Sequence, residues 1–412
     1  MSSFEEQLDR YADLLVTHGA NVQPGQIVQL TAEAVTRDFA VRVADAAYRR
    51  GAKWVQLDLI DARSGRSRFL HSKDEDLDFV PEYVKKKFDE MVESKAATIR
   101  LIGSEDPDIL SDLAPAKLNR SRVASYHAAK RFYEDGIGRG QVHWTVAAAA
   151  TEGWGQKVFP ELDGPSAEKK LWEAIFKLVR ADREDSLEAW DEHNERLHKR
   201  GKTLSEMKIS ELHFTGPGTD LVVGLSEKAV FKGGTDMGPY GVPFEPNVPT
   251  EEVFTTPDWR RTQGTVRVTR PFLVNGKLIE GLKIEFADGK VSKVTADSGQ
   301  ETFQEYIASD EGASRLGEVA LVGIDSPVFQ SGLVFQEILF DENAACHIAV
   351  GSAYKNCLQG GESMTPEQLK EVGCNESSAH TDMMISDEQV DVVAKTYGGD
   401  EVVLLKNGEW QI

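Results

Sequence analysis

The spacing of apolar residues changes near residue 202, and this change constrains the fold more than any other feature of the chain. Before it, short apolar runs alternate with amphipathic helical runs. Strands are predicted at 25–33, 54–61, 97–106 and 142–150, and helices at 4–18, 36–50, 118–133, 167–179 and 186–200. Strands that alternate with helices of this length are typical of a doubly wound, largely parallel sheet.

The second half of the chain has a different pattern, in which apolar and polar residues alternate over short segments. Asn275-Gly276 and Asp288-Gly289 interrupt these segments and predict β-hairpins, because type I′ turns need positive φ at both central positions. Helices are predicted at 365–372 and 387–397. We therefore predict an N-terminal α/β domain over residues 1–204 and a C-terminal α+β domain over residues 205–412.

Composition excludes several classes of protein. With 40% hydrophobic and 28% charged residues, the chain is typical of soluble globular proteins. A net charge of −21 disfavours nucleic acid as a main partner, since phosphate binding needs clustered Lys and Arg. No apolar run reaches the roughly 18 residues of a membrane span, and the polar, acidic N-terminus does not resemble a signal peptide. Three cysteines without a CxxC pattern indicate reduced thiols, so we expect a cytoplasmic protein.

The last third of the chain spaces out side chains that suit divalent metal ions. Imidazole with several carboxylates, and no obligatory cysteine, is the donor set of hydrolytic zinc, cobalt, manganese or magnesium sites. Three glutamates and an aspartate carry more negative charge than one divalent cation balances, so we predict two cations. The candidate ligands are Glu252, Glu318, Glu342, His347, His380 and Asp382.

Local spacing supports some of these candidates and leaves others open. His380 and Asp382 lie two residues apart, so on a strand both would project to the same face. Alternation does not decide which of Glu251 and Glu252 points inward. His347 has an alternative interpretation as a core histidine that Glu342 holds by a hydrogen bond. Cys346 is disfavoured as a ligand, because neighbours on a strand face opposite sides.

Four segments resemble the signature segments of the M29 family of metallo-aminopeptidases in order and spacing. They are PTEEVFTTP, LGEVALV, DENAACHIAVGSAY and NESSAHTDMMI, and all lie beyond residue 236. The resemblance extends over the whole chain, including its N-terminal α/β half. It implies a metal-dependent exopeptidase that acts on small peptides with a free N-terminus. It also implies a homodimer whose active site is enclosed in a large internal cavity.

The resemblance also assigns roles to individual residues. It selects Glu252 from the Glu251-Glu252 pair and implies that Glu318 bridges the two metal ions. It matches Glu342 to a ligand or a general base, and Tyr354 to an active-site tyrosine. The implied ligands are Glu252, Glu318, His347, His380 and Asp382, with Glu342 as the sixth candidate.

Two other functions fit part of this pattern. His347, His380 and Asp382 alone would make the two-histidine, one-carboxylate triad of a mononuclear iron, ring-cleaving dioxygenase. The additional carboxylates disfavour it, because that chemistry needs open iron positions. A non-catalytic metal-binding protein is the other alternative, but structural zinc sites are closed and rich in cysteine.

Overall fold

The computed structural model describes residues 3–412, which form two compact units. The first unit contains the described residues through Leu113, together with Ala124–Glu195 and Gly234–Thr250. The second unit contains Ala114–Val123, Arg196–Gly233 and Glu251–Ile412. Each unit is therefore assembled from separate stretches of the chain, and the domain limits 1–204 and 205–412 stay a prediction.

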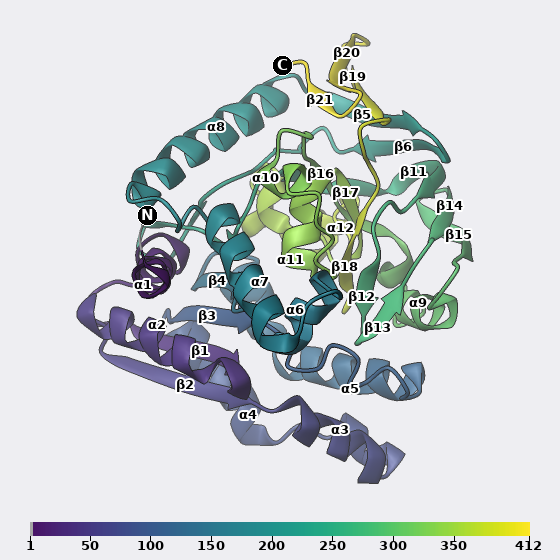
Figure 1. The fold of residues 1–412 in the computed structure, drawn as a ribbon. Coiled ribbons are helices and arrows are strands. Elements are labelled where there is room, and N and C mark those ends of the chain that lie inside the picture. The colour runs from purple at the N-terminus through teal and green to yellow at the C-terminus, as the bar shows by residue number, and fades with distance from the viewer. Residues whose placement is uncertain (1–2) are drawn as a thin grey trace. The chain divides into compact units, whose positions relative to one another are not determined.

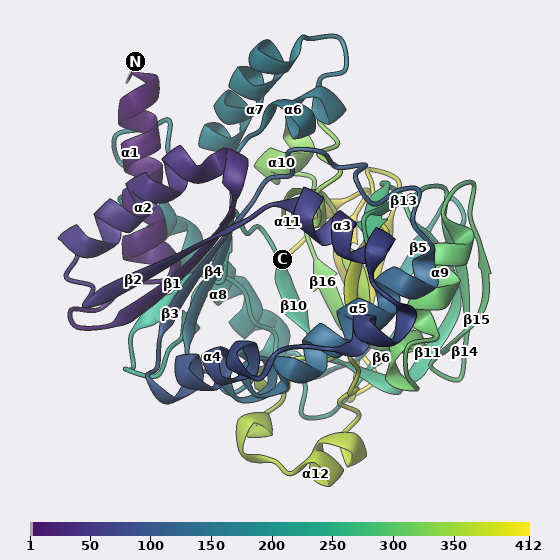
Figure 2. The ribbon, with the colours of Figure 1, turned by 90° about the horizontal axis from the view of Figure 1, so that it is seen from below.

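A parallel sheet forms the centre of the first unit, with strand order β2-β1-β3-β4-β9. Figure 2 shows β1 to β4 side by side. This sheet confirms the predicted α/β architecture. The strands are β1 (Ile27–Glu33), β2 (Trp54–Ile60), β3 (Ala97–Ile102), β4 (His143–Ala148) and β9 (Asn247–Val248).

Helices of the first unit follow the predicted amphipathic runs. α1 (Phe4–Leu14) begins at a capping box between Ser3 and Glu6, which satisfies two backbone donors. α3, α4 and α6 are helices that the sequence pattern did not predict. The remaining helices of this unit are α2 (Arg37–Arg49), α3 (Ala62–His71), α4 (Glu82–Glu93), α6 (Glu152–Val158) and α7 (Gly164–Leu178), with short turns η1 (Leu15–Gly19), η2 (Ala34–Thr36), η3 (Asp74–Asp78) and η4 (Phe132–Ile137). Two further helices, α5 (Pro115–Ala128) and α8 (Ser186–Glu206), continue from one unit into the other.

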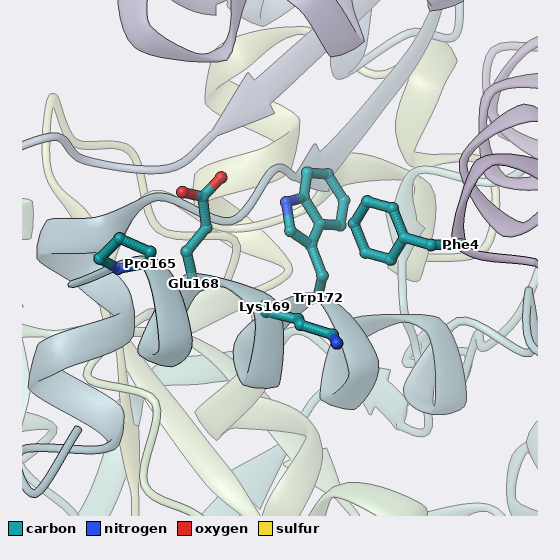
Figure 3. Close-up of a pocket in the computed structure, with 5 residues that line it drawn as sticks. All are labelled: Phe4, Pro165, Glu168, Lys169 and Trp172. Carbon is teal, nitrogen blue, oxygen red and sulfur yellow. The ribbon is translucent and has the colours of Figure 1, made fainter. Parts of the chain in front are cut away.

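A surface pocket of about 320 Å³ lies on the first unit. Figure 3 shows that Phe4 of α1 and Trp172 of α7 line it. It includes none of the predicted ligands.

An antiparallel sheet of eight strands is the larger sheet of the second unit, in the order β15-β14-β11-β6-β5-β19-β20-β21. Asp288-Gly289 connects β14 to β15, and Asn275-Gly276 connects β12 to β13, all four with positive φ. Both predicted hairpins are confirmed. The strands are β5 (Ile209–Gly216), β6 (Thr219–Leu225), β11 (Pro257–Arg267), β12 (Phe272–Val274), β13 (Lys277–Ile279), β14 (Lys283–Ala287), β15 (Lys290–Thr295), β19 (Asp391–Thr396), β20 (Glu401–Lys406) and β21 (Glu409–Trp410).

The helix predicted at 387–397 is wrong, because this segment contains strand β19. Val390, Val392 and Ala394 are buried at every second position, which is the period of a strand. β19 lies between β5 and β20 and pairs with both. Pairing on both edges and the β-branched valines outweigh the weak helical pattern.

A second, four-stranded antiparallel sheet has the order β10-β16-β17-β18. Figure 1 labels β16, β17 and β18, and Figure 2 labels β10. The cross-strand row of Val319, Ile348 and Met383 is fully buried in the apolar core of the unit. Because side chains alternate along a strand, the neighbours of these residues point to the opposite face. The strands are β10 (Val253–Thr255), β16 (Leu316–Leu321), β17 (His347–Gly351) and β18 (His380–Met384).

Short elements complete the second unit. The helix predicted at 365–372 is confirmed as α12 (Pro366–Glu371), which starts at a capping box between Thr365 and Gln368. No helix within residues 3–412 is long and apolar enough to cross a membrane. The other elements are α9 (Gln300–Ile307), α10 (Pro327–Gln330), α11 (Ile338–Asp341), η5 (Gly312–Ser314), η6 (Glu342–Ala344), η7 (Lys355–Cys357) and η8 (Gly361–Ser363), and the two-residue strands β7 (Asp236–Met237) and β8 (Pro243–Phe244) lie in the first unit.

Candidate metal centre

Strand register places four of the predicted ligands on one face of the four-stranded sheet. Glu318 pairs with Ala349, and Ala349 pairs with Asp382, so these three side chains share a face. His347 lies two residues before Ala349, and His380 lies two residues before Asp382. Since positions two apart project to the same side, both histidines join that face.

Glu252 reaches the same face from the loop that leads into β10. Phe254 pairs with Ala320, and Ala320 pairs with His347. Glu252 precedes Phe254 by two residues and lies beside His347, with Nε2 of His347 2.8 Å from its Oε2. Ala320 and Ala349 are the small side chains between the donors, and both are fully buried.

A β-bulge adjusts β16 at the position where its carboxylate is needed. The pairing of β16 with β17 shifts in register between Leu316 and Glu318. Gly317 lies in this bulge, where a Cβ atom would come within 2.2 Å of the carbonyl oxygen of Ser352. Bulges re-aim side chains beside functional sites, and this one lies directly before Glu318.

The ligand atoms form two groups that share Glu318. Within each group they lie within 4.8 Å of one another. His380 Nε2 lies 3.3 Å from Glu318 Oε2 and 3.8 Å from Asp382 Oδ1. One group is Glu252, Glu318 and His347, and the other is Glu318, His380 and Asp382.

Backbone carbonyls select the tautomer of both histidines. His347 Nδ1 lies 3.1 Å from the carbonyl oxygen of Ala345, and His380 Nδ1 lies 2.9 Å from that of Ser352. A carbonyl oxygen only accepts hydrogen bonds, so each Nδ1 carries the hydrogen. The lone pair of each neutral imidazole is therefore on Nε2, the atom that faces the carboxylates, as metal-binding histidines require.

Burial and the neighbouring carboxylates shift the pKa values of the side chains at this site. Burial, with a smaller contribution from Asp382, raises the pKa of Glu318 to about 7 against the opposing effect of His380. Burial would lower the pKa of His380, but the carboxylates of Asp382 and Glu318 raise it to about 9. The pKa of His347 is also raised well above its ordinary value, because contact with Glu252 outweighs burial. A positive charge at this position is thus strongly favoured.

Two carboxylate oxygens at this site show how far the protein itself satisfies the negative charge. With the hydrogen of each imidazole on Nδ1, neither Oε2 of Glu252 nor Oδ1 of Asp382 accepts a hydrogen bond within residues 3–412, although Nε2 of His347 and Nε2 of His380 lie 2.8 Å and 3.8 Å from them. Their side chains are 8% and 11% exposed, so water reaches little of either carboxylate. Buried charge without a partner is costly. Oxygen and imidazole donors directed at one another with unsatisfied lone pairs fit divalent metal ions.

Glu342 and Tyr354 lie at the border of the two groups. Glu342, at the start of η6, is buried and outside both groups. Burial raises its pKa well above the ordinary value, and the carboxylates of Asp382 and Glu252 add to this effect. The hydroxyl of Tyr354 lies 3.4 Å from Nε2 of His380. Tyr354 is therefore close enough to act on a molecule bound beside His380, and Glu342 is within the electrostatic reach of the ligand carboxylates.

Cys346 is absent from both groups, as strand alternation predicts. Its Sγ lies 3.4 Å from the backbone nitrogen and carbonyl oxygen of Val322. Burial raises the pKa of this thiol, so the neutral form is favoured.

Asp310 is a structural carboxylate of this region that the sequence did not reveal. It accepts hydrogen bonds from the hydroxyls of Ser377 and Ser378 and from the backbone N–H groups of Ser378 and Ala313. These bonds hold the loop that leads into β18 and therefore into His380. An isolated Asp in a Ser- and Asp-rich stretch carries no sequence signal for this role.

Comparison with known proteins identifies the class. The model of the thermophilic metalloprotease family M29 matches residues 4–410, so the chain belongs to the M29 family. This result confirms the resemblance seen in the sequence.

Individual relatives match the chain over its full length. It is 40% identical to aminopeptidase PepS of Streptococcus thermophilus, and the match covers 100% of both chains. It is also 40% identical to aminopeptidase T of Thermus thermophilus, again over 100% of each. The solved structure of wild-type AmpT from Thermus thermophilus superposes with a TM-score of 0.90 at 38% identity, covering 100% of both chains.

Proposed function

We propose that this protein is a metal-dependent aminopeptidase that uses two divalent cations to remove N-terminal residues from peptides. The observation that carries the proposal is the pair of ligand groups that share Glu318 on one sheet face. Family membership and the names of the relatives, which are aminopeptidases, support the same activity.

The two groups would each hold one cation. Glu252 and His347 would bind the first, His380 and Asp382 the second, and Glu318 would bridge them. The cations, drawn from Zn²⁺, Co²⁺, Mn²⁺ and Mg²⁺, would polarise the scissile carbonyl, supply hydroxide near neutral pH and anchor the α-amine of the substrate. The first two effects address the weak electrophilicity of an amide, and the third positions its scissile bond.

Residues of the chain would move the protons and stabilise the developing charge. The hydroxyl of Tyr354, beside His380, would donate a hydrogen bond to the oxygen of the tetrahedral intermediate. Glu318 or Glu342 would accept a proton from the attacking water and deliver it to the leaving amine. Glu342 lies outside both ligand groups, so a bound cation would not occupy its carboxylate during this transfer.

Blocking the substrate amine tests the exopeptidase part of the proposal. Leucine p-nitroanilide should be hydrolysed after addition of Co²⁺ or Zn²⁺, whereas its N-acetylated form should not, since acetylation removes the amine that would bind a cation. Similar rates on both substrates would contradict the aminopeptidase and indicate an endopeptidase or amidase.

Two other functions have less support. The iron dioxygenase needs His347, His380 and Asp382 with open positions, but Glu252 and Glu318 occupy the same face as these residues. No cysteine joins either group within the described chain, unlike a cysteine-rich structural zinc site.

We also propose a cytoplasmic homodimer that acts on small peptides. The first unit exposes large apolar side chains that a partner subunit would cover. Sedimentation equilibrium would test this assembly, and a monomer at micromolar concentration would contradict it. The exposed side chains are Trp54, Leu59, Ile60, Leu70, Phe79 and Tyr83.

A further inference from the structure

The strand that carries His380 and Asp382 lies at an edge of its sheet. β18 pairs with β17 on one side and follows it at the end of the strand order. Backbone groups on the open side of an edge strand have no strand partner. His380 is the first residue of this strand, so its backbone would be the easiest part of the site to displace.

One tyrosine hydroxyl binds both backbone groups of His380. The hydroxyl of Tyr306, on α9, accepts a hydrogen bond from the N–H of His380 at 2.9 Å and donates one to its carbonyl oxygen at 2.9 Å. Tyr306 is 4% exposed, so few water molecules could replace these bonds. A hydroxyl can accept and donate at once, whereas a phenyl ring can do neither.

A guanidinium group holds this tyrosine and the residues before the strand. Arg122, in the part of α5 that belongs to the second unit, lies 4.7 Å from the centre of the Tyr306 ring. It donates hydrogen bonds to the carbonyl oxygen of Ser378, to Ser309 and to Asn119. Arg122 therefore links the ring of Tyr306 to the backbone two residues before His380.

We propose that Tyr306 is a positioning residue for the metal centre, and that Arg122 supports it. This inference rests on the proposed two-metal function. By binding both backbone groups of His380, Tyr306 fixes the direction in which the imidazole leaves the strand. The effect should be confined to the group of Glu318, His380 and Asp382, because the Tyr306 hydroxyl binds the backbone of His380 with both of its hydrogen bonds.

The test measures cobalt binding by Tyr306→Phe after chelator treatment of the full-length protein. We expect one of two Co²⁺ equivalents to lose about 10–100-fold in affinity, the usual effect of removing a group that orients a metal ligand. Its visible absorption should change, and kcat for leucine p-nitroanilide should recover as Co²⁺ is raised. A purely structural tyrosine would instead lower the melting temperature and leave affinity and spectrum unchanged.

Tyr11→Phe is the matched control. Tyr11 is also buried, and its hydroxyl accepts a hydrogen bond from the backbone N–H of Ala148 in the first unit. This variant should lose stability without any change in Co²⁺ affinity. Arg122→Gln is a second variant, which keeps Tyr306 and should weaken the same cobalt equivalent by a smaller factor.

The outcomes separate this inference from the proposed function. Wild-type protein that binds no Co²⁺ overturns both. Wild-type protein with two equivalents, and Tyr306→Phe and Arg122→Gln with the same affinities and spectrum, overturn only the role of Tyr306. Loss of both equivalents to the same degree in either variant also overturns it, because the effect would then not be local to His380.

Discussion

The two faces of the four-stranded sheet come from the same strands but meet opposite demands. One face presents Val319, Ile348 and Met383 to the apolar core. The other presents carboxylates and imidazoles that are also mostly buried, although two of the carboxylate oxygens accept no hydrogen bond from the described chain. The apolar face stabilises the fold, and the polar face weakens it until a cation is bound.

This difference shows how one sheet can combine a face that stabilises the fold with a face that destabilises it. A buried carboxylate elsewhere in the unit is satisfied by the protein itself: Asp341 pairs with Arg270 at 3.1 Å and accepts two backbone N–H groups. On the polar face, Glu252, Glu318 and Asp382 instead lie beside the imidazoles of His347 and His380. A neutral imidazole does not balance the charge of a carboxylate, so that charge is left to an external cation rather than to a structural ion pair.

The largest effect should come from removing a donor of the polar face. His380→Ala should lower kcat/KM by about 10³-fold or more and cost one metal equivalent, because several kcal/mol of transition-state stabilisation depend on a bound cation. Exhaustive treatment with chelator should abolish activity, and added Co²⁺ or Zn²⁺ should restore it. Elemental analysis and steady-state kinetics measure both.

His213→Ala is the control for that substitution. His213 lies on β5, where it contacts Asp220 at 2.7 Å and is partly exposed. We expect His213→Ala to keep the wild-type metal content. If His380→Ala retained two equivalents, the polar face would not be the metal centre.

The next effect concerns a hydroxyl beside the polar face. Tyr354→Phe should lower kcat by about 10²–10³-fold, the usual loss for one hydrogen-bond donor to an oxyanion. Metal content and melting temperature should barely change, since the ring retains its packing against Phe254. Tyr397→Phe, which removes a hydroxyl bonded to the carbonyl oxygen of Leu225, is the control. A kcat within about threefold of wild type would make Tyr354 a structural residue only.

A substitution on the apolar face should separate stability from chemistry. Ile348→Ala should destabilise the fold by about 3 kcal/mol, through lost burial and the cavity that remains. Metal content per folded molecule should stay at the wild-type value, because Ile348 points away from the donors. Denaturant titration with a metal assay measures both quantities. Loss of metal in a fully folded Ile348→Ala protein would mean that the two faces are not independent.

The smallest effect should come from a carboxylate that the protein satisfies. Burial alone would raise the pKa of Asp310, but hydrogen bonds from Ser378, Ser377 and Ala313 outweigh it and hold the pKa below its usual value. A depressed folded-state pKa contributes stability that is present above the unfolded pKa, near 4, and is lost as pH falls. Asp310→Asn should therefore cost about 1 kcal/mol at pH 7 and less as the pH falls below 4. An equal loss at both pH values would show that the carboxylate charge has no part.

Much of the fold follows from patterns that a single sequence carries. The parallel sheet and both hairpins were predicted, because buried runs and Asn-Gly or Asp-Gly turns depend on local chemistry. Strand β19 was not, since pairing with β5 and β20 decides its state. Residues 234–250, which belong to the first unit despite lying beyond residue 204, depend in the same way on distant contacts.

The residues of the candidate site also divide into those that the sequence indicates and those that only distant contacts reveal. Residue types and family-like segments marked Glu252, Glu318, His347, His380 and Asp382, and the structure brings all five together. Their assignment as ligands stays a prediction until a metal is measured. Tyr306 and Asp310 had no signal, because a tyrosine or aspartate that binds the backbone of a distant strand resembles any other in the sequence.

The two alanines between the donors suggest a use for the sheet beyond its natural one. Ala349 lies between Glu318 and Asp382 in the cross-strand row, so its methyl group forms the floor beneath the space that cations would fill. The larger side chain of Ala349→Val would extend into the space for the cations, while every ligand residue would remain in the chain. Such a variant would be inactive but would keep the same ligands. Comparing its stability with that of the wild type would separate the effect of the ligand side chains on folding from the effect of the bound ions.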